Sequence, residues 1–595
     1  MSVISADEGE VLRMFSFARK RRSNVKCQWA NADDVRAAGL SADEHNRGGI
    51  ILGSWRARKG RSDLLKYKGP HHVLVVGPAR SGKSAGVTVP TLLNWDESVV
   101  IYDTKGENWA LTSGFRAQRL GQRVLKFDPV APDSARFNPL LEVRLDRHML
   151  EDVQSICTLI VDPHGMGIED HWKSTAFGLL VGVVTFLLLC DPPEVVPSFD
   201  RSLATVLAIL SDGGPFRAAA VSAGAASEES RALVRDARAV FSYIREVAYS
   251  KLRSISSTDA CPGDNAEYEA RRVGWRIIAV SMEAWLDKPA NEAGSVLSTA
   301  LSFLSLYRDP IVADNTRVSD FSVESLMGGK NPDGQAVKEK TSLYLVVPPS
   351  DKDRLKPLLR IVVSQVVRRL TEGMDFDTGG GKSRFPHRLL LLIDEFPSLG
   401  KLEIFEEALA FIAGYGMKAL LIVQDRVQLA KSYTKEESIF SNCHIRIAYA
   451  PNNPETADML SKMCGQATVT HVQRQYSGNR MHIMLQNVNT NEQIVGRPLL
   501  TADECMRLPP DDEIVFVAGT APIYCQKIKY YGDSAMAART ALGMAASTGR
   551  GPEADGDYAS RPAPDGSPEE DGGADETPTG GDDTSRPDTD GEDIE

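Results

Sequence analysis

The feature that most constrains this chain is the octapeptide GPARSGKS at residues 77–84, which fits the pattern G-x-x-x-x-G-K-[ST]. The β-branched run HHVLVV at 71–76 precedes it and a helix-compatible segment follows, as in the strand-to-helix turn of a phosphate-binding loop. In such a turn backbone N–H groups surround an anion, Lys83 reaches phosphate oxygens and Ser84 ligates Mg²⁺. The pattern therefore predicts a site for ATP and Mg²⁺. Its expected lining residues are Gly77, Pro78, Ala79, Arg80, Ser81, Gly82, Lys83, Ser84 and Ala85.

A second motif supplies the acidic half of such a site. Five apolar residues, 389–393, are followed by Asp394 and Glu395, as expected for a central parallel strand with ligands at its carboxyl end. Asp394 suits a Mg²⁺ ligand acting through water, and Glu395 suits a general base that polarises the attacking water. The alternative is a strand end capped by solvated acids. Two adjacent acids favour hydrolysis over transfer to a small substrate.

The segment KALLIVQD at 418–425 predicts a further strand, which ends at Gln424. In a doubly wound sheet Gln424 is expected one strand away from Asp394. There its amide would contact the γ-phosphate or the attacking water in a sensor role. An ordinary polar residue at a strand end is the alternative, because a single Gln is a weak motif.

Lys83 and Asp394 are 311 positions apart, much farther than in compact P-loop domains, which indicates an insertion. Strands are predicted at 98–104 and 123–129, helical patterns run from about 145 to 320, and strand patterns resume at 341–349. The predicted fold is therefore α/β: a RecA-like P-loop core with a central parallel sheet, interrupted by an all-α domain. The expected parts are an N-terminal segment (1–69), the first part of the core (70–144), the insertion (145–330), the second part of the core (331–545) and a tail (546–595).

The acidity of the chain belongs to its C-terminal tail. Residues 551–595 hold 16 of the 80 acidic and 2 of the 68 basic residues, which gives this segment a net charge of −14. The whole chain has a net charge of −12, so residues 1–550 carry +2. Rich in Gly, Pro, Asp and Glu, this segment has too few apolar groups to offset chain entropy and is predicted to be disordered. It is either a solubilising tail or a docking or autoinhibitory segment.

Three features of the sequence indicate the compartment of the protein and its contact with membranes. The eight cysteines are scattered and form no C-x-x-C pair, which favours a reducing, cytoplasmic environment. The most apolar run, residues 177–190, is too short to cross a bilayer and is predicted to be a buried core helix, so no transmembrane segment is expected. The basic stretches 17–26 and 56–68 are either solvated faces or contacts to anionic lipid or phosphate.

Longer motifs occur around these in a specific order. They are GPARSGKSAGVTVPTLLNWDESVVIYDTKGENWALTSGFR with its D-x-K-G-E, FDPVAPDSARFNPL, HWKSTAFGLL, LYLVVPPSDKDRLKPLLRIVVSQ, LLIDEFPSLGKL, GYGMKALLIVQD and LLTADECMRLPPDDEIVFVAG. The series resembles that of type IV secretion coupling proteins of the TraG/VirD family, over about residues 30–535. Relatives usually begin with two transmembrane helices, a feature not expected here.

The resemblance implies an ATP-hydrolysing coupling protein that recruits relaxase-bound single-stranded DNA, effector proteins or both for a type IV secretion or conjugation channel. It also implies a homo-hexamer around a pore, contacts with inner-membrane components of the channel, and a peripheral position at the cytoplasmic face of the bacterial inner membrane. Alternatives are an effector receptor with slow or regulatory ATP turnover, and a DNA translocase of the FtsK/HerA kind outside secretion. A P-loop kinase is disfavoured because no acceptor-site signature is evident.

Two roles have several candidates in the sequence. Some relatives carry an Arg before the sensor strand as a finger that reaches a neighbouring subunit, but AGYGMK at 413–418 has none, so Arg80, Lys418 or Arg446 could substitute. The segment EYEARRVGWRII at 267–278 is either a basic-aromatic contact to single-stranded DNA or a packed helix.

Overall fold

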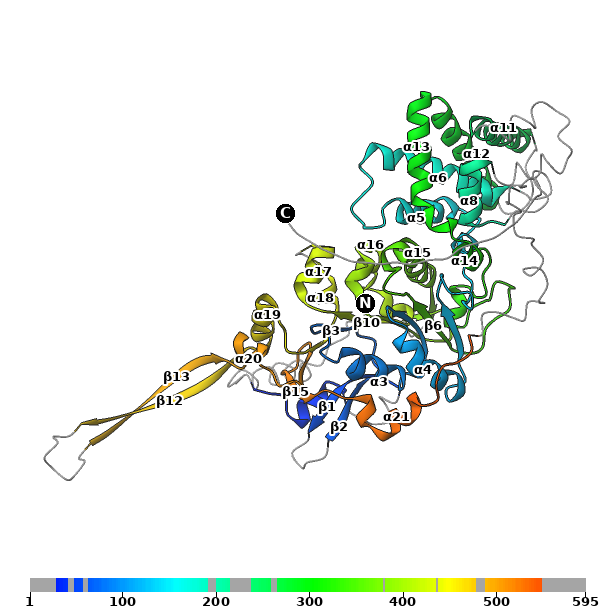
Figure 1. The fold of residues 1–595 in the computed structure, drawn as a ribbon. Helices are drawn as coiled ribbons and strands as arrows, with labels where there is room; N and C mark the ends of the chain where they lie inside the picture. The colour runs from blue at the N-terminus through cyan, green and yellow to red at the C-terminus, as the bar shows by residue number, and fades with distance from the viewer. Residues whose placement is uncertain are drawn as a thin grey trace, which may run out of the picture. The chain divides into compact units, whose positions relative to one another are not determined.

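An eleven-stranded mixed sheet organises the molecule, with strand order β2-β1-β15-β14-β11-β3-β10-β9-β4-β6-β5 (Figure 1). The computed structural model describes residues 28–40, 48–56, 62–190, 200–213, 237–257, 265–377, 380–434, 437–477 and 487–547. The run from β11 to β5 is parallel throughout, which confirms the predicted central parallel sheet. Its strands are β3 (Val73–Val76), β4 (Ser98–Asp103), β5 (Arg123–Phe127), β6 (Thr341–Val346), β9 (Leu389–Ile393), β10 (Met417–Val423) and β11 (Ile445–Ala448).

The central strands are continuous apolar runs because both of their faces are covered. Alternate residues of β9 enter two different cores: Leu389, Leu391 and Ile393 pack on one face, and Leu390 and Leu392 on the other. The second face is covered by η2 (Ser84–Thr88), α3 (Val89–Leu92) and α4 (Glu107–Gln118). The sheet is thus the middle layer of the core.

The antiparallel end of the sheet comes from both ends of the chain. The C-terminal strands β14 (Asp512–Val517) and β15 (Ile523–Gln526) lie beyond β11 and β3. Outside them lies the hairpin of β1 (Ile50–Arg56) and β2 (Ser62–Tyr67), which includes much of the basic stretch 56–68 and was not predicted as strands. In that segment Lys68 pairs with Asp96 at 3.3 Å and so acts structurally; residues 57–61 lie outside the described residues, as does the stretch 17–26.

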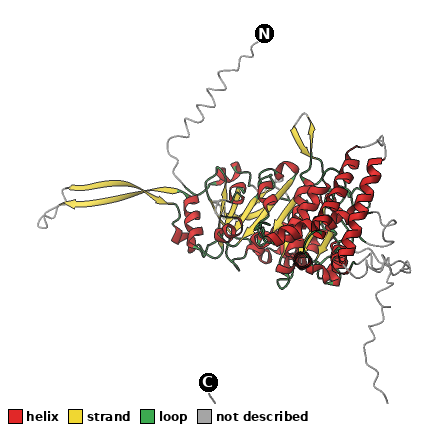
Figure 2. Ribbon diagram, turned by 90° about the horizontal axis from the view of Figure 1, so that it is seen from above, coloured by secondary structure: helices red, strands yellow, loops and turns green. Residues whose placement is uncertain are grey.

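Helices fill the interval between β5 and β6. Between Met149 and Asn315 the described residues contain helices and no strand, which agrees with the predicted helical insertion; residues 191–199, 214–236 and 258–264 are outside the described set. Figures 1 and 2 show these helices gathered at one end of the sheet. They are α5 (Met149–Val161), α6 (His171–Leu189), α8 (Leu203–Asp212), α11 (Ala237–Ser257), α12 (Asn265–Leu286), α13 (Ala290–Phe303) and α14 (Pro310–Asn315).

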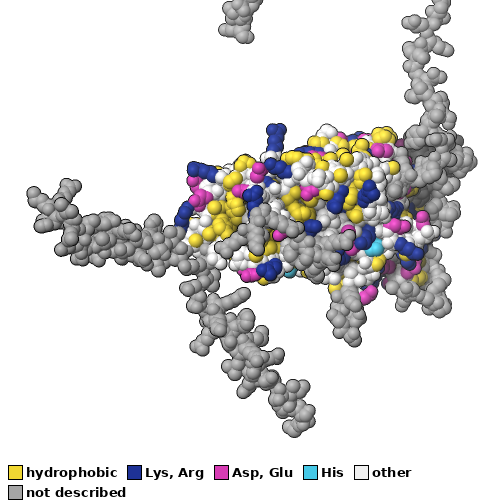
Figure 3. All heavy atoms as spheres, turned by 90° about the horizontal axis from the view of Figure 1, so that it is seen from below, with side chains coloured by type: hydrophobic (Ala, Val, Ile, Leu, Met, Phe, Trp, Pro, Cys, Tyr) yellow, Lys and Arg dark blue, Asp and Glu magenta, His cyan; other side chains and the backbone are white. Residues whose placement is uncertain are grey.

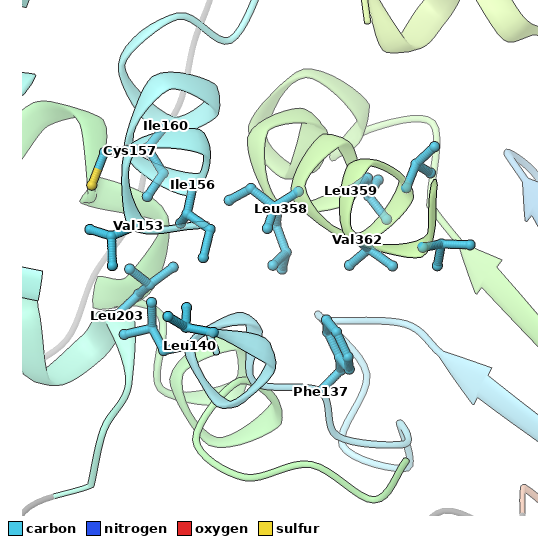
Figure 4. Close-up of a cluster of buried hydrophobic side chains, with 14 of the residues drawn as sticks. Phe137, Leu140, Val153, Ile156, Cys157, Ile160, Leu203, Leu358, Leu359 and Val362 are labelled. Carbon is cyan, nitrogen blue, oxygen red and sulfur yellow. The ribbon is translucent and has the colours of Figure 1, made fainter. Parts of the chain in front are cut away.

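One helix of the core, α15 (Lys352–Leu370), joins this helical layer to the sheet. Figure 4 shows Leu358 of α15 facing Ile156 and Ile160 of α5. These side chains are all buried in a single apolar cluster that also contains the facing residues of β9. Burial of this continuous area is the main stabilising term for the contact.

By length and composition alone, α6 is the one helix of the described residues that is long and apolar enough to span a membrane. In the fold 67% of its most apolar window is buried, against α5, α12 and α13. Its apolar surface is therefore used for packing, as expected of a core helix.

Two β-hairpins lie outside the main sheet. Strands β12 (Gln466–Ser477) and β13 (Asn487–Pro498) form an antiparallel ladder that extends away from the sheet, between α19 (Pro454–Cys464) and α20 (Ala502–Met506) (Figures 1 and 2). A shorter one pairs β7 (Met374–Asp377) with β8 (Gly380–Ser383). Neither was predicted. The remaining helices are α2 (Ala32–Ala37), α16 (Glu403–Ala408), α17 (Arg426–Tyr433), α18 (Ile439–Asn442) and α21 (Ser534–Thr540).

After α21 the chain runs back beside α4 and the edge strand β5. Ala545 N–H donates to Ser113 Oγ (3.0 Å), and Lys126 N–H donates to Ser547 Oγ (3.2 Å). The acidic segment predicted to be disordered lies outside the described residues from 548 onward. On the face seen in Figure 3, basic, acidic and apolar side chains are interspersed, in keeping with the near-zero net charge before the tail.

Candidate functional site

The glycine-rich turn joins the carboxyl end of β3 to η2. Gly77 N–H donates to Val423 O of the neighbouring β10 (3.2 Å), and Gly86 N–H donates to Gly82 O (2.8 Å) as the helix begins. A Cβ on Gly77 would lie 3.0 Å from the Tyr449 Cβ, and Gly82 has φ +91°, so both positions favour glycine. Lys83 Nζ donates to the carbonyls of Gly77 (2.5 Å) and Pro78 (2.8 Å).

The acidic motif ends the strand β9, two strands from the glycine-rich turn. Strand register aligns Val76 with Val423, and Leu421 with Ile393, so Gln424 and Asp394 emerge at the same edge of the sheet as the glycine-rich turn. Strand β10 lies between β3 and β9, which puts Gln424 one strand from Asp394 as expected. Glu395 has φ +57°, a left-handed conformation that is strained for a residue with a side chain.

These segments surround one pocket of about 400 Å³. The structure therefore brings the two predicted motifs and Gln424 together in space. Gly77 and Pro78 do not line the pocket and act instead through the carbonyls that accept from Lys83. The lining residues are Ala79, Arg80, Ser81, Gly82, Lys83, Ser84, Ala85, Thr104, Lys105, Glu107, Ile422, Val423, Gln424, Asp394 and Glu395.

Burial dominates the electrostatics of the pocket. It raises the pKa of Asp394 to about 6, against the opposing effect of the Lys83 ammonium, while the carboxylates of Asp103 and Glu395 raise it further. Burial lowers the pKa of Lys83, and the nearby charges of Asp394 and Glu395 oppose that shift. The pocket thus contains the cation Lys83 and the acids Asp394 and Glu395, whose opposite charges partly compensate each other.

Three lysines lie around the pocket, of which the sequence singled out only Lys105, as part of the D-x-K-G-E motif. Lys105 lines it from the turn after β4. Lys352, the first residue of α15, pairs with Glu395 Oε2 at 3.2 Å. Lys527, just after β15, donates to Ser81 O (3.2 Å) and lies 3.9 Å from the centre of the Tyr449 ring. The DTKGE motif was a signal for Lys105. Lys352 and Lys527 come after β6 and β15 in the chain, and the place of these strands in the sheet depends on tertiary pairing.

Two of the residues suggested for a trans-acting cation are placed elsewhere. Lys418 is the second residue of β10 and is 1% exposed; its Nζ donates to Gly69 O (3.0 Å) at the amino-end edge of the sheet. Arg446 is likewise the second residue of its strand, β11, and its guanidinium donates to Phe440 O (2.9 Å). The Lys418 side chain is buried against backbone carbonyls and cannot reach a neighbouring subunit, so that suggestion is wrong. The suggestion of Arg446 stays a prediction. Arg80 is exposed beside the pocket.

The basic-aromatic candidate at 267–278 is part of α12. Trp275 is 4% exposed and packs against Phe186, and Arg272 pairs with Glu269 at 2.9 Å. Arg271 lies 3.5 Å from Glu267. The segment is a helix with its aromatic ring in the core, which favours the packed-helix alternative, while Arg276 is exposed.

The donor set of the pocket fits a nucleotide with Mg²⁺. Hydroxyl and carboxylate oxygens, here of Ser84 and Asp394, are the ligands that Mg²⁺ takes from proteins, and both residues line the pocket. Backbone N–H groups of the turn and the Lys83 ammonium suit phosphate oxygens. The residues present therefore match the group that the motif predicts.

The fold and the pocket define the chain as an α/β protein with a RecA-like P-loop core. The family described as "Type IV secretory system Conjugative DNA transfer" matches residues 28–550. The chain belongs to this family, as the sequence resemblance indicated. The conjugal transfer protein TraG of Escherichia coli is 40% identical over 544 residues, with 87% of this chain and 77% of that protein covered. VirD4 of Agrobacterium fabrum (strain C58 / ATCC 33970) is 28% identical, with 87% and 67% covered.

Solved structures support the fold. The unbound monoclinic form of the bacterial conjugative coupling protein TrwBdeltaN70 has a TM-score of 0.53 and 17% identity, and the match covers 84% of this chain and 91% of that chain. The plasmid coupling protein TrwB in complex with ADP and Mg²⁺ has a TM-score of 0.51 and 15% identity, with 84% and 94% covered. The predicted RecA-like α/β core is thereby confirmed.

Proposed function

We propose that this chain is the ATP-hydrolysing motor of a type IV secretion system, which recruits relaxase-bound single-stranded DNA, effector proteins or both and delivers them to the channel. The observation that carries the proposal is the meeting of Lys83, Ser84, Asp394 and Glu395 around one pocket, although 311 positions separate the two motifs. Family membership supplies the type IV secretion context, and the complex of TrwB with ADP and Mg²⁺ supports the cofactors ATP and Mg²⁺.

Each residue has a role that follows from its chemistry. Ser84 and Asp394 hold Mg²⁺, and Lys83 leaves its loop carbonyls to neutralise charge on the phosphate oxygens. Glu395 accepts a proton from the attacking water, and the Gln424 amide orients that water or the γ-phosphate. Bound Mg²⁺·ATP supplies the phosphoryl group and the charge that these residues stabilise. A cation from a neighbouring subunit completes the site, and Arg80 and Arg446 are the candidates that remain.

The assembly follows from the family. A homo-hexamer would place each nucleotide at a subunit interface and enclose a pore, and it would dock on inner-membrane components of the channel from the cytoplasmic side. Within the chain we assign residues 145–330 as the inserted recruiting domain between the two parts of the core, 70–144 and 331–545. Loss of the γ-phosphate contact after hydrolysis would shift one subunit against the next.

The test is ATP hydrolysis by the full chain with and without single-stranded DNA. We expect stimulation by DNA that weakens as salt rises, because phosphate contacts release counterions. Lys83→Thr is expected to abolish turnover, and Glu395→Gln to abolish it while nucleotide binding remains. Full turnover in Lys83→Thr would refute the site. Binding of effector proteins without ATP or DNA, with no stimulation by DNA, would favour the receptor function instead.

A further inference from the structure

Glu395, which follows the proposed Mg²⁺ ligand Asp394, forms one ion pair among the described residues. Glu395 lies in the left-handed backbone region at φ +57°, and its Oε2 lies 3.2 Å from Lys352 Nζ. Within the described ranges no other cation lies at ion-pair distance from the Glu395 carboxylate. We propose that Lys352 is a positioning residue that holds the Glu395 carboxylate in its water-activating place, a proposal that rests on the ATPase function above.

The register of the sheet explains how the two side chains meet. Tyr102 of β4 pairs with Ile393 of β9 on one side and with Leu345 of β6 on the other. The segments that follow β9 and β6 therefore emerge at the same edge, about 10 Å apart across the intervening strand. Glu395 reaches across this gap from one side, and Lys352 from the first turn of α15 on the other.

The backbone around Glu395 needs such support. Ser398 N–H donates to Glu395 O (2.9 Å), and Asp394 N–H donates to Tyr102 O (3.3 Å), so the turn is bonded on both sides of the residue. A non-glycine residue in this conformation persists only where its surroundings fix it. The ion pair fixes the side chain, as the hydrogen bonds fix the main chain.

The ion pair leaves the chemistry of Glu395 intact. Lys352 engages Oε2, so Oε1 is the oxygen that accepts a proton from water. Glu395 lines the pocket, whereas Lys352 does not, and the side chains are 31% and 27% exposed respectively. Because Lys352 does not line the pocket, we assign it the positioning of the carboxylate and no contact with the nucleotide.

Lys352→Met in the full chain separates this role from a general structural one. We expect kcat for ATP to fall about tenfold, since a displaced base loses part of the 10²–10⁴-fold contribution of proton transfer, with KM and nucleotide binding changed less than about twofold. Lys352→Arg keeps a cation and should restore most of kcat. In the Glu395→Gln background, where turnover is already abolished, Lys352→Met should leave nucleotide binding unchanged.

A second readout needs no nucleotide. Hydrogen exchange of the amides in residues 394–400 should be faster in Lys352→Met than in the parent protein. The matched control is Lys401→Met, because Lys401 pairs with Glu403 at 2.8 Å in the same segment but does not line the pocket. This control should change neither exchange at 394–400 nor kcat.

Several outcomes would overturn the proposal. One is an unchanged kcat together with unchanged hydrogen exchange in Lys352→Met. Another is a fall of kcat in Lys352→Arg as large as in Lys352→Met, and a third is a loss of nucleotide binding when Lys352→Met is added to Glu395→Gln. A parent protein without ATP turnover, or full turnover in Glu395→Gln, would refute the ATPase function and this inference together. An active parent, an inactive Glu395→Gln and a parent-like Lys352→Met would refute only the role of Lys352.

Discussion

Two lysines, Lys83 and Lys418, lie at opposite ends of the parallel strands, and burial lowers the pKa of both. Lys83 faces the carboxyl ends of the strands, where Asp394 and Glu395 oppose the shift. Lys418 lies at the amino ends, where its Nζ donates to backbone carbonyls and lies 4.1 Å from the centre of the Tyr67 ring. In the part of the chain that the structure describes, no carboxylate pairs with Lys418.

This difference separates a reactive edge from a structural edge of one sheet. At the carboxyl ends, charges face a pocket and are compensated by other charges. At the amino ends, polar side chains are buried against the backbone: His72 Nε2 lies 2.9 Å from Leu409 O, and Ala419 N–H donates to His72 Nδ1 (3.0 Å). Substitutions at the first edge should therefore change catalysis, and those at the second should change stability.

The largest effect is expected for Lys83→Met. Removing one preorganised cation from the site of developing phosphate charge costs about 10²–10³-fold in rate, so kcat for ATP should fall by at least about 100-fold. The urea unfolding midpoint without nucleotide should change little, because only the two loop carbonyls lose a donor. Steady-state ATPase assays and urea denaturation test the two halves. Normal turnover would break the proposed division between the edges.

The second prediction concerns acid stability through His72. Burial lowers the pKa of His72 to about 4 from 6.5, mainly because the charged ring would be desolvated. Between these values the unfolded chain binds the proton and the folded chain does not, so stability rises with pH and is lost as pH falls from 6.5 to 4. The loss amounts to about 3 kcal/mol. Protonation of Nδ1 would also remove the acceptor of the Ala419 N–H.

Urea denaturation between pH 7 and pH 4 measures this loss. His72→Gln should remove most of the slope, because the amide does not titrate. The same change at His171, whose side chain is 62% exposed, serves as the control and should leave the slope in place. An unchanged slope in His72→Gln would assign acid sensitivity to other groups.

Asp103 tests whether the reactive edge also contains structural acids. Asp103 is 1% exposed at the end of β4, and its carboxylate accepts from the N–H groups of Trp109 (2.9 Å) and Lys105 (3.3 Å). Asp103→Ala leaves both donors unpaired and should lower the free energy of unfolding by about 2 kcal/mol. Asp103→Asn keeps an acceptor and should cost less. Equal costs for the two variants in urea denaturation would contradict this role.

Much of the site was predictable because its parts follow local rules. The phosphate-binding turn is contiguous, and Asp394 and Glu395 follow an unbroken apolar strand, so spacing and order alone predicted both.

Other features depend on pairings between distant segments. Lys352 reaches the site from the first turn of α15, which follows β6, and Lys527 from the segment after β15. The neighbours of these strands in the sheet are set by tertiary pairing. The hairpin of β12 and β13 was missed because residues 466–498 hold few apolar residues and show no face that a core would bury. Local patterns carry little information about such elements.

Lys418→Met should have the smallest effect and defines the structural edge most sharply. Turnover should stay within about twofold of the parent protein, because the side chain lies at the opposite edge of the sheet from the pocket. Removal of a buried amino group is favourable, whereas Gly69 O loses its donor, so the net change in the free energy of unfolding should be under about 1 kcal/mol.

The pH dependence of Lys418→Met then identifies the titrating group. The pKa of Lys418 is lowered well below 10.5 by burial, so above the folded pKa and up to 10.5 the unfolded chain holds a proton that the folded chain has lost. Stability of the parent protein should therefore rise with pH across this range, and the rise should be absent in Lys418→Met. A variant that kept the rise would show that another buried base is responsible, and one that lost ATP turnover would move Lys418 into the nucleotide site.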